Sequence, residues 1–172
     1  MALLELIILP DPILRQVSTP VDRVVDALRR TLDDMVETMH DAPGIGLAAI
    51  QVGIPKRFLV LDLSDDEDKP EPLFLIKPEI VKLGDQRRVH EEGCLSIPDV
   101  RFDIERPATL TVRFTDRDGK PQQLDADGLL ATAIQHEIDH LDGKLIIDYM
   151  SRLKRDMIIR RFRKYARNDV GA

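Results

Sequence analysis

The sequence lacks several features, and each absence excludes a class of protein. One cysteine in 172 residues cannot form an internal disulfide, which excludes a disulfide-stabilised secreted scaffold. No run of 18 or more apolar residues is present, which argues against a membrane span. The first ten residues, MALLELIILP, have no basic lead and no small-residue cleavage site, so they fit a secretory signal poorly. We therefore expect a cytoplasmic protein.

What is present is the composition of an ordinary globular domain. Hydrophobic residues make up 43% of the chain and charged residues 33%. A length of 172 residues suffices for one buried core and is short for two domains. The chain has no internal repeat and no low-complexity tract. We therefore predict a single domain over residues 1–172, and nothing in the sequence requires more than a monomer.

The net charge of −6 is unevenly distributed along the chain. Residues 151–172 contain eight Lys and Arg against two Asp, a net charge of +6, which leaves −12 on residues 1–150. An acidic body is a poor surface for nucleic acid, so we expect no DNA partner. The basic C-terminal segment is the one part suited to a polyanion.

Hydrophobic periodicity predicts an α+β fold. Helices are expected at 22–40, at 128–141 after an Asp127 cap, and from a Ser151 cap to about Arg167, with 152–167 forming a basic helix. Strands are expected at 57–63, 73–76, 109–115 and 122–124, the last two joined by a hairpin turn. This order predicts mostly antiparallel sheets packed around the helix at 128–141, with N-terminal and C-terminal helices at the ends.

The helix at 128–141 carries an HExxH motif, His136-Glu137-Ile138-Asp139-His140. Residues four apart lie on one helix face, so both imidazoles can reach one metal ion while Glu137 acts as general acid/base on water. The alternative is a helix with two surface histidines. Much of this helix is apolar, however, and that places the histidines in or beside the core, where imidazoles need partners.

A hydrolytic metal site needs a third protein ligand, which can come from either side of the motif. Downstream, the third histidine of a metzincin is replaced by Ile146, and no Glu follows Glu137. Three downstream aspartates, Asp142, Asp148 and Asp156, stand in no recognisable ligand context. Upstream, His40 and His90 compete with Cys94, which lies in the polar segment Glu91–Pro98 rather than inside an apolar strand. From these residues alone, His90 remains the chief rival to Cys94.

Three segments together resemble the signature motifs of the peptide deformylases. They are GIGLAAIQ at 44–51, EGCLS at 92–96 and QHEIDHLDG at 135–143, in the order and spacing of that family. The resemblance extends over essentially the whole chain and is to the bacterial type with a C-terminal helix. It implies removal of the formyl group from the N-terminal formyl-methionine of nascent polypeptides, with release of formate.

The resemblance also implies a set of site residues. The metal ligands are Cys94, His136 and His140, and Glu137 is the general acid/base. The oxyanion donors are the side chain of Gln51 and the backbone N–H of Leu95. One divalent ion is implied, physiologically Fe²⁺, although this donor set also accepts Zn²⁺, Ni²⁺ or Co²⁺.

The substrate contacts implied by the resemblance are a backbone cradle and an apolar pocket for methionine. The candidates for both are Ile45, Gly46, Glu92, Gly93, Leu129, Thr132 and Ala133. His90 stands where many family members carry an aliphatic residue near this pocket.

The remaining basic residues have two interpretations each. Arg101 and Arg106 are interpreted first as surface charges, with a contact to Glu92 or to substrate as the alternative. In the C-terminal helix, Leu153, Met157, Ile158 and Phe162 predict a packed stripe. The basic face of this helix is either a solvated surface or, as the resemblance implies, a contact with ribosomal RNA near the exit tunnel.

Two other functions share part of this residue pattern with deformylation. A metalloprotease shares the HExxH motif, but it usually has a downstream third ligand, which is missing here. A non-catalytic ribosome-associated or metal-storing module would not need Gln51 and Glu137 beside an intact ligand set. Release of formate from a formyl-methionine dipeptide separates the three functions.

Overall fold

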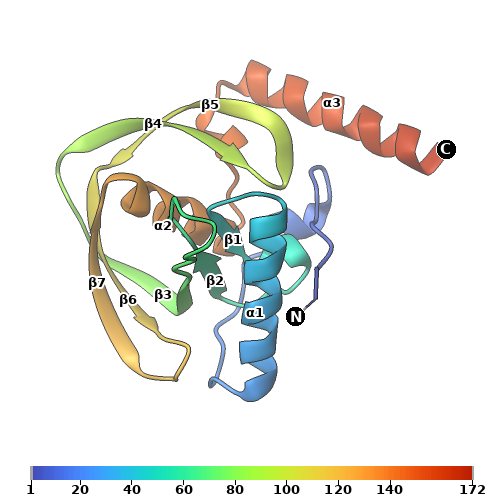
Figure 1. Cartoon of the computed structure of the whole chain (residues 1–172). Helices are drawn as coiled ribbons and strands as arrows, with labels where there is room; N and C mark the ends of the chain where they lie inside the picture. The colour runs from blue at the N-terminus through green and yellow to red at the C-terminus, as the bar shows by residue number, and fades with distance from the viewer. Residues whose placement is uncertain (1, 172) are drawn as a thin grey trace.

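A computed structural model describes residues 2–171 and shows an α+β fold (Figure 1). The helices are α1 (Asp26–Asp41), α2 (Gly128–Leu141) and α3 (Arg152–Gly171). The strands are β1 (Gly46–Ala48), β2 (Phe58–Leu61), β3 (Leu73–Leu83), β4 (Arg87–Cys94), β5 (Ile97–Pro107), β6 (Thr109–Thr115) and β7 (Pro121–Asp127). Three short 3₁₀ helices are η1 (Pro12–Arg15), η2 (Ala49–Val52) and η3 (Ile146–Tyr149).

The strands form two antiparallel sheets. The larger has five strands in the order β1-β2-β3-β6-β7, and the smaller pairs β4 with β5. The predicted hairpin is the β6–β7 pair. Strand β1 lies at one edge of the large sheet, and β4 has a partner on one side. Two strand edges are thus left to border the functional site.

Strand β2 is buried on both faces because a helix covers each side. Leu59 and Leu61 belong to the core cluster of α2, whereas Phe58 and Val60 belong to that of α1. Successive strand residues point to opposite faces, so a continuous apolar run is what a strand between two helices requires. The helix α2 therefore lies in the interior, as predicted.

Several element boundaries differ from the sequence prediction. Helix α1 begins at Asp26 rather than at residue 22, and α3 continues to Gly171. The strand predicted at 73–76 continues to Leu83, because a register shift and a positive φ of 52° at Lys77 accommodate Pro78 within it. Strands β4 and β5 were not predicted at all. The predicted cap is present at Ser151, whose Oγ accepts a hydrogen bond from the backbone N–H of Lys154 at 3.3 Å.

Helix α3 lies at the periphery of the molecule (Figure 1). Ile158 and Phe162 pack into the cluster that contains Val100 of β5, but Leu153 is 74% exposed and Met157 58% exposed. The predicted four-residue stripe was therefore wrong for those two. Leu153 and Met157 lie one turn apart on a row about 140° from the row of the buried pair, and the body covers one row only. No helix in the described part of the chain is long and apolar enough to cross a membrane.

Candidate metal centre

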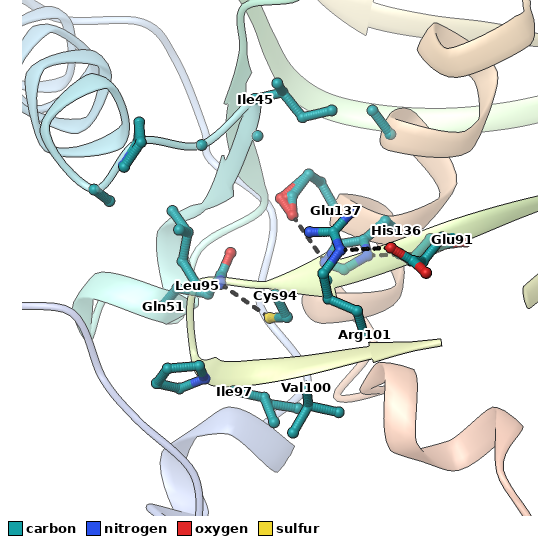
Figure 2. A pocket seen from close by; sticks show the side chains of 18 of the residues that line it. Ile45, Gln51, Glu91, Cys94, Leu95, Ile97, Val100, Arg101, His136 and Glu137 are labelled. Carbon is teal, nitrogen blue, oxygen red and sulfur yellow. Dashed lines mark hydrogen bonds and ion pairs between the residues drawn. The ribbon is translucent and has the colours of Figure 1, made fainter. Parts of the chain in front are cut away.

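Three side chains from two elements converge beside the interior helix. Cys94 ends β4, and His136 and His140 lie one turn apart on α2. The sulfur of Cys94 and one ring nitrogen of each histidine all lie within 4.8 Å of one another. Cys94 Sγ is 3.3 Å from Nε2 of His140. Figure 2 shows Cys94 close to His136 and Glu137, with its sulfur directed at Gln51.

The hydrogen bonds of His136 suit a metal ligand. Its Nδ1 is 3.0 Å from Oε1 of Glu92, so the ring donates there and leaves the lone pair of Nε2 free for a metal. Glu92 is itself held by Arg106, with Nε–Oε2 at 2.7 Å and Nη2–Oε1 at 3.0 Å. Both residues of this ion pair are buried, Arg106 to 4% exposure. The interpretation of Arg106 as a surface charge was therefore wrong, and the alternative contact with Glu92 is observed.

The electrostatics of the site favour a cation. Burial by itself would lower the pKa of His136, but Glu137, Cys94 and Glu92 outweigh it and raise that pKa well above its ordinary value. The same negative groups would favour a divalent cation, which would displace the proton from Nε2 of His136 on binding. Burial and the charge of His136 lower the pKa of His140, which keeps that imidazole in the neutral form a metal binds. Its Nδ1 has no hydrogen-bond partner among the described residues.

Glu137 is buried beside the three candidate ligands and is 2% exposed. Burial raises its pKa to about 7, close to the value a proton-transfer group needs near neutral pH. Its Oε2 has no hydrogen-bond partner within residues 2–171, and the residue lines the cavity described below. Gly46 permits this placement, since a Cβ there would lie 3.0 Å from Glu137 Cγ and 2.9 Å from Leu61 Cδ2.

The amide of Gln51 is oriented by the backbone. Its Oε1 accepts a hydrogen bond from the N–H of Ala48 at 2.9 Å, so Nε2 must face the other way. That nitrogen donates to Ser96 Oγ at 3.0 Å and lies 3.6 Å from Cys94 Sγ, as Figure 2 shows for Cys94. A buried donor is thereby aimed at the candidate metal centre.

A cavity of about 690 Å³ opens over these residues. It lies between the segment leading into β1, the β4–β5 turn and one face of α2. All of the predicted substrate-contact residues line it: Ile45, Gly46, Glu92, Gly93, Leu129, Thr132 and Ala133. So do Gln51 and Leu95. The two carboxylate oxygens of Glu92, however, are occupied by His136 and Arg106.

The cavity also contains residues that the sequence did not single out, including Leu6, Asp99 and Val100. Leu6 comes from the N-terminal segment, more than 80 residues from the cysteine motif, and no local signal marks it. Val100 follows the motif closely and alternates with charged residues, which is a readable strand signal. Arg101, also in the lining, is exposed and pairs with Glu91 at 2.9 Å, as expected of a surface charge.

The two rival histidines lie outside the candidate ligand group. His40 lies in the last turn of α1, and its Nε2 is 2.8 Å from Asp62 Oδ2. His90 Nδ1 is 2.7 Å from Thr132 Oγ1. Within the described residues, the group able to hold a metal is Cys94, His136 and His140. The structure thus favours Cys94 over both rivals.

A thiolate and two imidazoles beside a buried glutamate, on a helix below an open cavity, form the site of an HExxH metallohydrolase. Comparison with known proteins narrows this class. The family described as Polypeptide deformylase matches residues 3–156. The peptide deformylase of Rhizobium meliloti is 60% identical over 167 residues, covering 97% of this chain and 96% of the relative.

Solved structures give the same result. The crystal structure of peptide deformylase from Ehrlichia chaffeensis aligns with a TM-score of 0.91 at 38% identity, covering 98% of this chain and 99% of that one. A second structure from that organism, in complex with actinonin, aligns with a TM-score of 0.89 at 38% identity, covering 96% and 98%. The chain therefore belongs to the peptide deformylase family.

Membership confirms the resemblance and the α+β fold inferred from the sequence. The protein is a metal-dependent hydrolase that removes the formyl group from the N-terminal formyl-methionine of nascent polypeptides and releases formate. The metalloprotease and the binding module are thereby set aside.

Proposed function

We propose that Cys94, His136 and His140 hold the metal ion on which deformylation depends. The convergence of their ligand atoms within 4.8 Å is the observation that carries this proposal. The free Nε2 of His136 and the neutral form of His140 support it. A bound divalent ion supplies Lewis-acid chemistry, polarising the formyl carbonyl and activating water for attack.

Glu137 moves the protons in this scheme. Its carboxylate takes a proton from the attacking water and delivers one to the leaving amine as the bond to the formyl carbon breaks. A group that must accept and then donate needs a pKa near the working pH, and burial supplies that shift. Its Oε2 lies beside the cavity without another partner among the described residues, so it is free for this exchange.

Gln51 and Leu95 provide the hydrogen bonds to the oxyanion. The amide of Gln51 donates without titrating, and the Ala48 N–H keeps its Nε2 facing the site. Leu95 follows Cys94 in the β4–β5 turn, so its backbone N–H lies beside the thiolate. Donors that are oriented before the reaction stabilise developing charge at little reorganisation cost.

The substrate backbone lies between two strand edges. Ile45 and Gly46 border the cavity at the edge strand β1, and Gly93 borders it at β4. An extended peptide can add to such edges through main-chain hydrogen bonds, which read no sequence. The methionine side chain enters the part of the cavity near Leu129 and Ala133, with Ile45 and Thr132 completing its wall. Glu92 borders this site but acts through His136.

The bound metal is Fe²⁺ in the cell under this proposal, with Zn²⁺, Ni²⁺ or Co²⁺ as replacements in purified protein. A donor set of one sulfur and two nitrogens accepts each of these ions. Metal analysis after anaerobic purification tests the assignment, with one equivalent of iron as the expected result. A thiolate bound to ferrous iron would also make Cys94 sensitive to oxidation.

The remaining parts of the proposal concern the whole chain. The enzyme acts as a single domain over residues 1–172 and as a monomer in the cytoplasm. The exposed basic side chains of α3 would contact ribosomal RNA near the exit tunnel, where formylated nascent chains emerge. The Ehrlichia chaffeensis relative was solved in complex with actinonin, and by this proposal actinonin also binds the present protein, in the cavity over the metal centre.

The central experiment measures formate release by metal-replete protein. A formyl-methionine dipeptide should yield formate, a peptide blocked at both ends should remain uncut, and actinonin should suppress the reaction. Cys94→Ala, His136→Ala and His140→Ala should each lose the metal together with the activity. If any of the three variants retained a full equivalent of metal and normal formate release, the ligand assignment would be wrong.

A further inference from the structure

Tyr149, the last residue of η3, lies at the end of a hydrogen-bond chain that starts at His136. Its hydroxyl donates to Asp139 Oδ2 at 2.6 Å and accepts from Arg106 Nη1 at 3.0 Å. Arg106 binds Glu92 through two nitrogens, and Glu92 Oε1 contacts Nδ1 of His136. An exposed surface residue is thereby connected to a candidate metal ligand.

The contacts around Arg106 determine the orientation of its planar guanidinium. Nε and Nη2 point at Glu92, while Nη1 donates to both Asp139 and Tyr149. The tyrosine ring also lies under the guanidinium, with Cζ 4.6 Å from the ring centroid. The guanidinium is rigid and planar, so a rotation that moves Nη1 also moves Nε and Nη2, which bind Glu92. The tyrosine hydroxyl and Asp139 therefore limit the position of Glu92.

The backbone of η3 places Tyr149 with little freedom. Ile146 and Ile147 are buried in the core. Asp148 binds Arg15 through both carboxylate oxygens, at 2.6 and 2.9 Å. Tyr149 itself remains 45% exposed, so it buries little apolar surface for a residue of its size. Its hydroxyl contacts, rather than its packing, are what it contributes at this position.

We propose that Tyr149 is a positioning residue for the metal centre, whose hydroxyl holds Arg106, and through it Glu92, so that Nε2 of His136 stays directed at the metal. This inference rests on the proposed function, since it takes His136 as a ligand. Loss of a group that directly orients a metal ligand typically costs 10- to 100-fold in metal affinity or activity. Tyr149 acts two residues further out, through Arg106 and Glu92, so we expect roughly a 3- to 10-fold effect.

The test compares Tyr149→Phe with Tyr165→Phe in the Co²⁺-substituted protein. The first variant keeps the ring beneath Arg106 and removes both hydroxyl contacts. The second removes an exposed hydroxyl from α3 and serves as the matched control. We expect Tyr149→Phe to release Co²⁺ to excess chelator about 3- to 10-fold faster. Its visible cobalt spectrum should change, its melting temperature should stay within about 2 °C of the parent, and Tyr165→Phe should match the parent throughout.

Two results would overturn the proposal. One is release of Co²⁺ by Tyr149→Phe at the parent rate with an unchanged spectrum. The other is faster release with a melting temperature lowered by more than about 5 °C, which would indicate general loosening of the fold. The parent protein separates these failures from failure of the proposed function, because Cys94 is the only thiol in the chain. If the Co²⁺-substituted parent showed no thiolate-to-cobalt absorption band, the ligand set itself would be wrong, whatever Tyr149 does.

Discussion

At the scale of single residues, the site depends on a buried side chain at Glu137 and on the lack of a side chain at Gly46, which lies against it. Glu137 needs burial, because burial raises its pKa to about 7. Gly46 needs the absence of a side chain, because that absence lets the edge strand approach Glu137. Both properties can be tested by conservative substitutions.

Glu137→Gln keeps the shape of the side chain and removes its ability to transfer protons. We expect formate release to fall about 10²- to 10⁴-fold, with metal content unchanged. Parallel assays of formate and bound metal check this prediction. Glu91→Gln, which alters an exposed carboxylate at the same cavity, should stay within about twofold of the parent. If Glu137→Gln kept more than about a tenth of the activity, Glu137 would not be the proton-transfer group.

Gly46→Ala places a methyl group 2.9 Å from Leu61 Cδ2 and 3.0 Å from Glu137 Cγ. One of these neighbours must move, and misplacement of a reacting group by about 1 Å costs about 100-fold. We expect kcat to fall roughly 10- to 100-fold, as measured by formate release at saturating substrate. Adding Leu61→Val relieves only the contact with Leu61. If that double variant recovered full activity, displacement of Glu137 would not be the cause.

At the scale of elements, β5 shows how a strand can carry both core and site residues. Val100, Phe102 and Ile104 alternate with charged residues and point to one face, and Arg106 continues that same face. The period of two was readable in the sequence, and it would have placed Arg106 inside. The strand was missed because its composition is charged. Strand β4 gives no such signal, since most of its residues are polar.

Helix α3 carries its buried apolar residues and its exposed basic residues on different rows of side chains. Ile158 and Phe162 attach it to the body, while Arg160, Arg163 and Lys164 are exposed. Replacing those three basic residues by Gln should reduce the fraction of protein that sediments with ribosomes. Added salt should reduce that fraction for the parent protein as well, because binding to a polyanion releases counterions. Formate release from a dipeptide should not change. Deletion of 152–172 would expose the apolar surface that Ile158 and Phe162 cover, whereas this triple substitution leaves it covered.

The matched control replaces three exposed arginines elsewhere, Arg87, Arg88 and Arg113, by Gln. Both triple variants lower the charge by the same amount, so a difference between them reports position rather than net charge. Equal sedimentation of the two variants and the parent would contradict the role proposed for α3.

At the scale of the whole molecule, ion pairs connect segments that are distant in sequence. Asp33 of α1 pairs with Arg117 in the β6–β7 turn, and Asp148 of η3 pairs with Arg15 of η1. The hydrogen bond from Arg117 lowers the pKa of Asp33. For Asp148, burial would raise the pKa, but the hydrogen bonds from Arg15 and from the Leu145 N–H, together with the nearby positive charges, outweigh it and the pKa is lowered.

These lowered pKa values predict a loss of stability in acid. Each carboxylate contributes fully above the pKa of an unfolded aspartate, about 3.9, and the contribution is lost as pH falls through the lower folded value. The free energy of unfolding should therefore decrease below about pH 4. Asp148→Asn should flatten that decrease, as measured by urea unfolding across pH. Asp65→Asn, in the exposed loop, should not, and equal slopes for both variants would contradict the prediction.

The sequence by itself determined the features that depend on residues close together in the chain. The helical period from 128 to 141 places His136 and His140 one turn apart and Glu137 beside them, because helix geometry follows from local hydrogen bonds. The hairpin between β6 and β7 and the cap at Ser151 are local in the same sense. For these features, residue type and spacing were sufficient.

Only the tertiary structure decided which distant groups meet at that helix. The residues alone left Cys94 and His90 as rivals for the third ligand. The antiparallel β4–β5 pair brings Cys94 to the histidines and directs His90 to Thr132 instead. The burial of Arg106 and its contact with Tyr149 likewise depend on the packing of β5 against α2 and η3. Such contacts arise because two sheets and an interior helix must share one core, and no local pattern in the chain records how they do so.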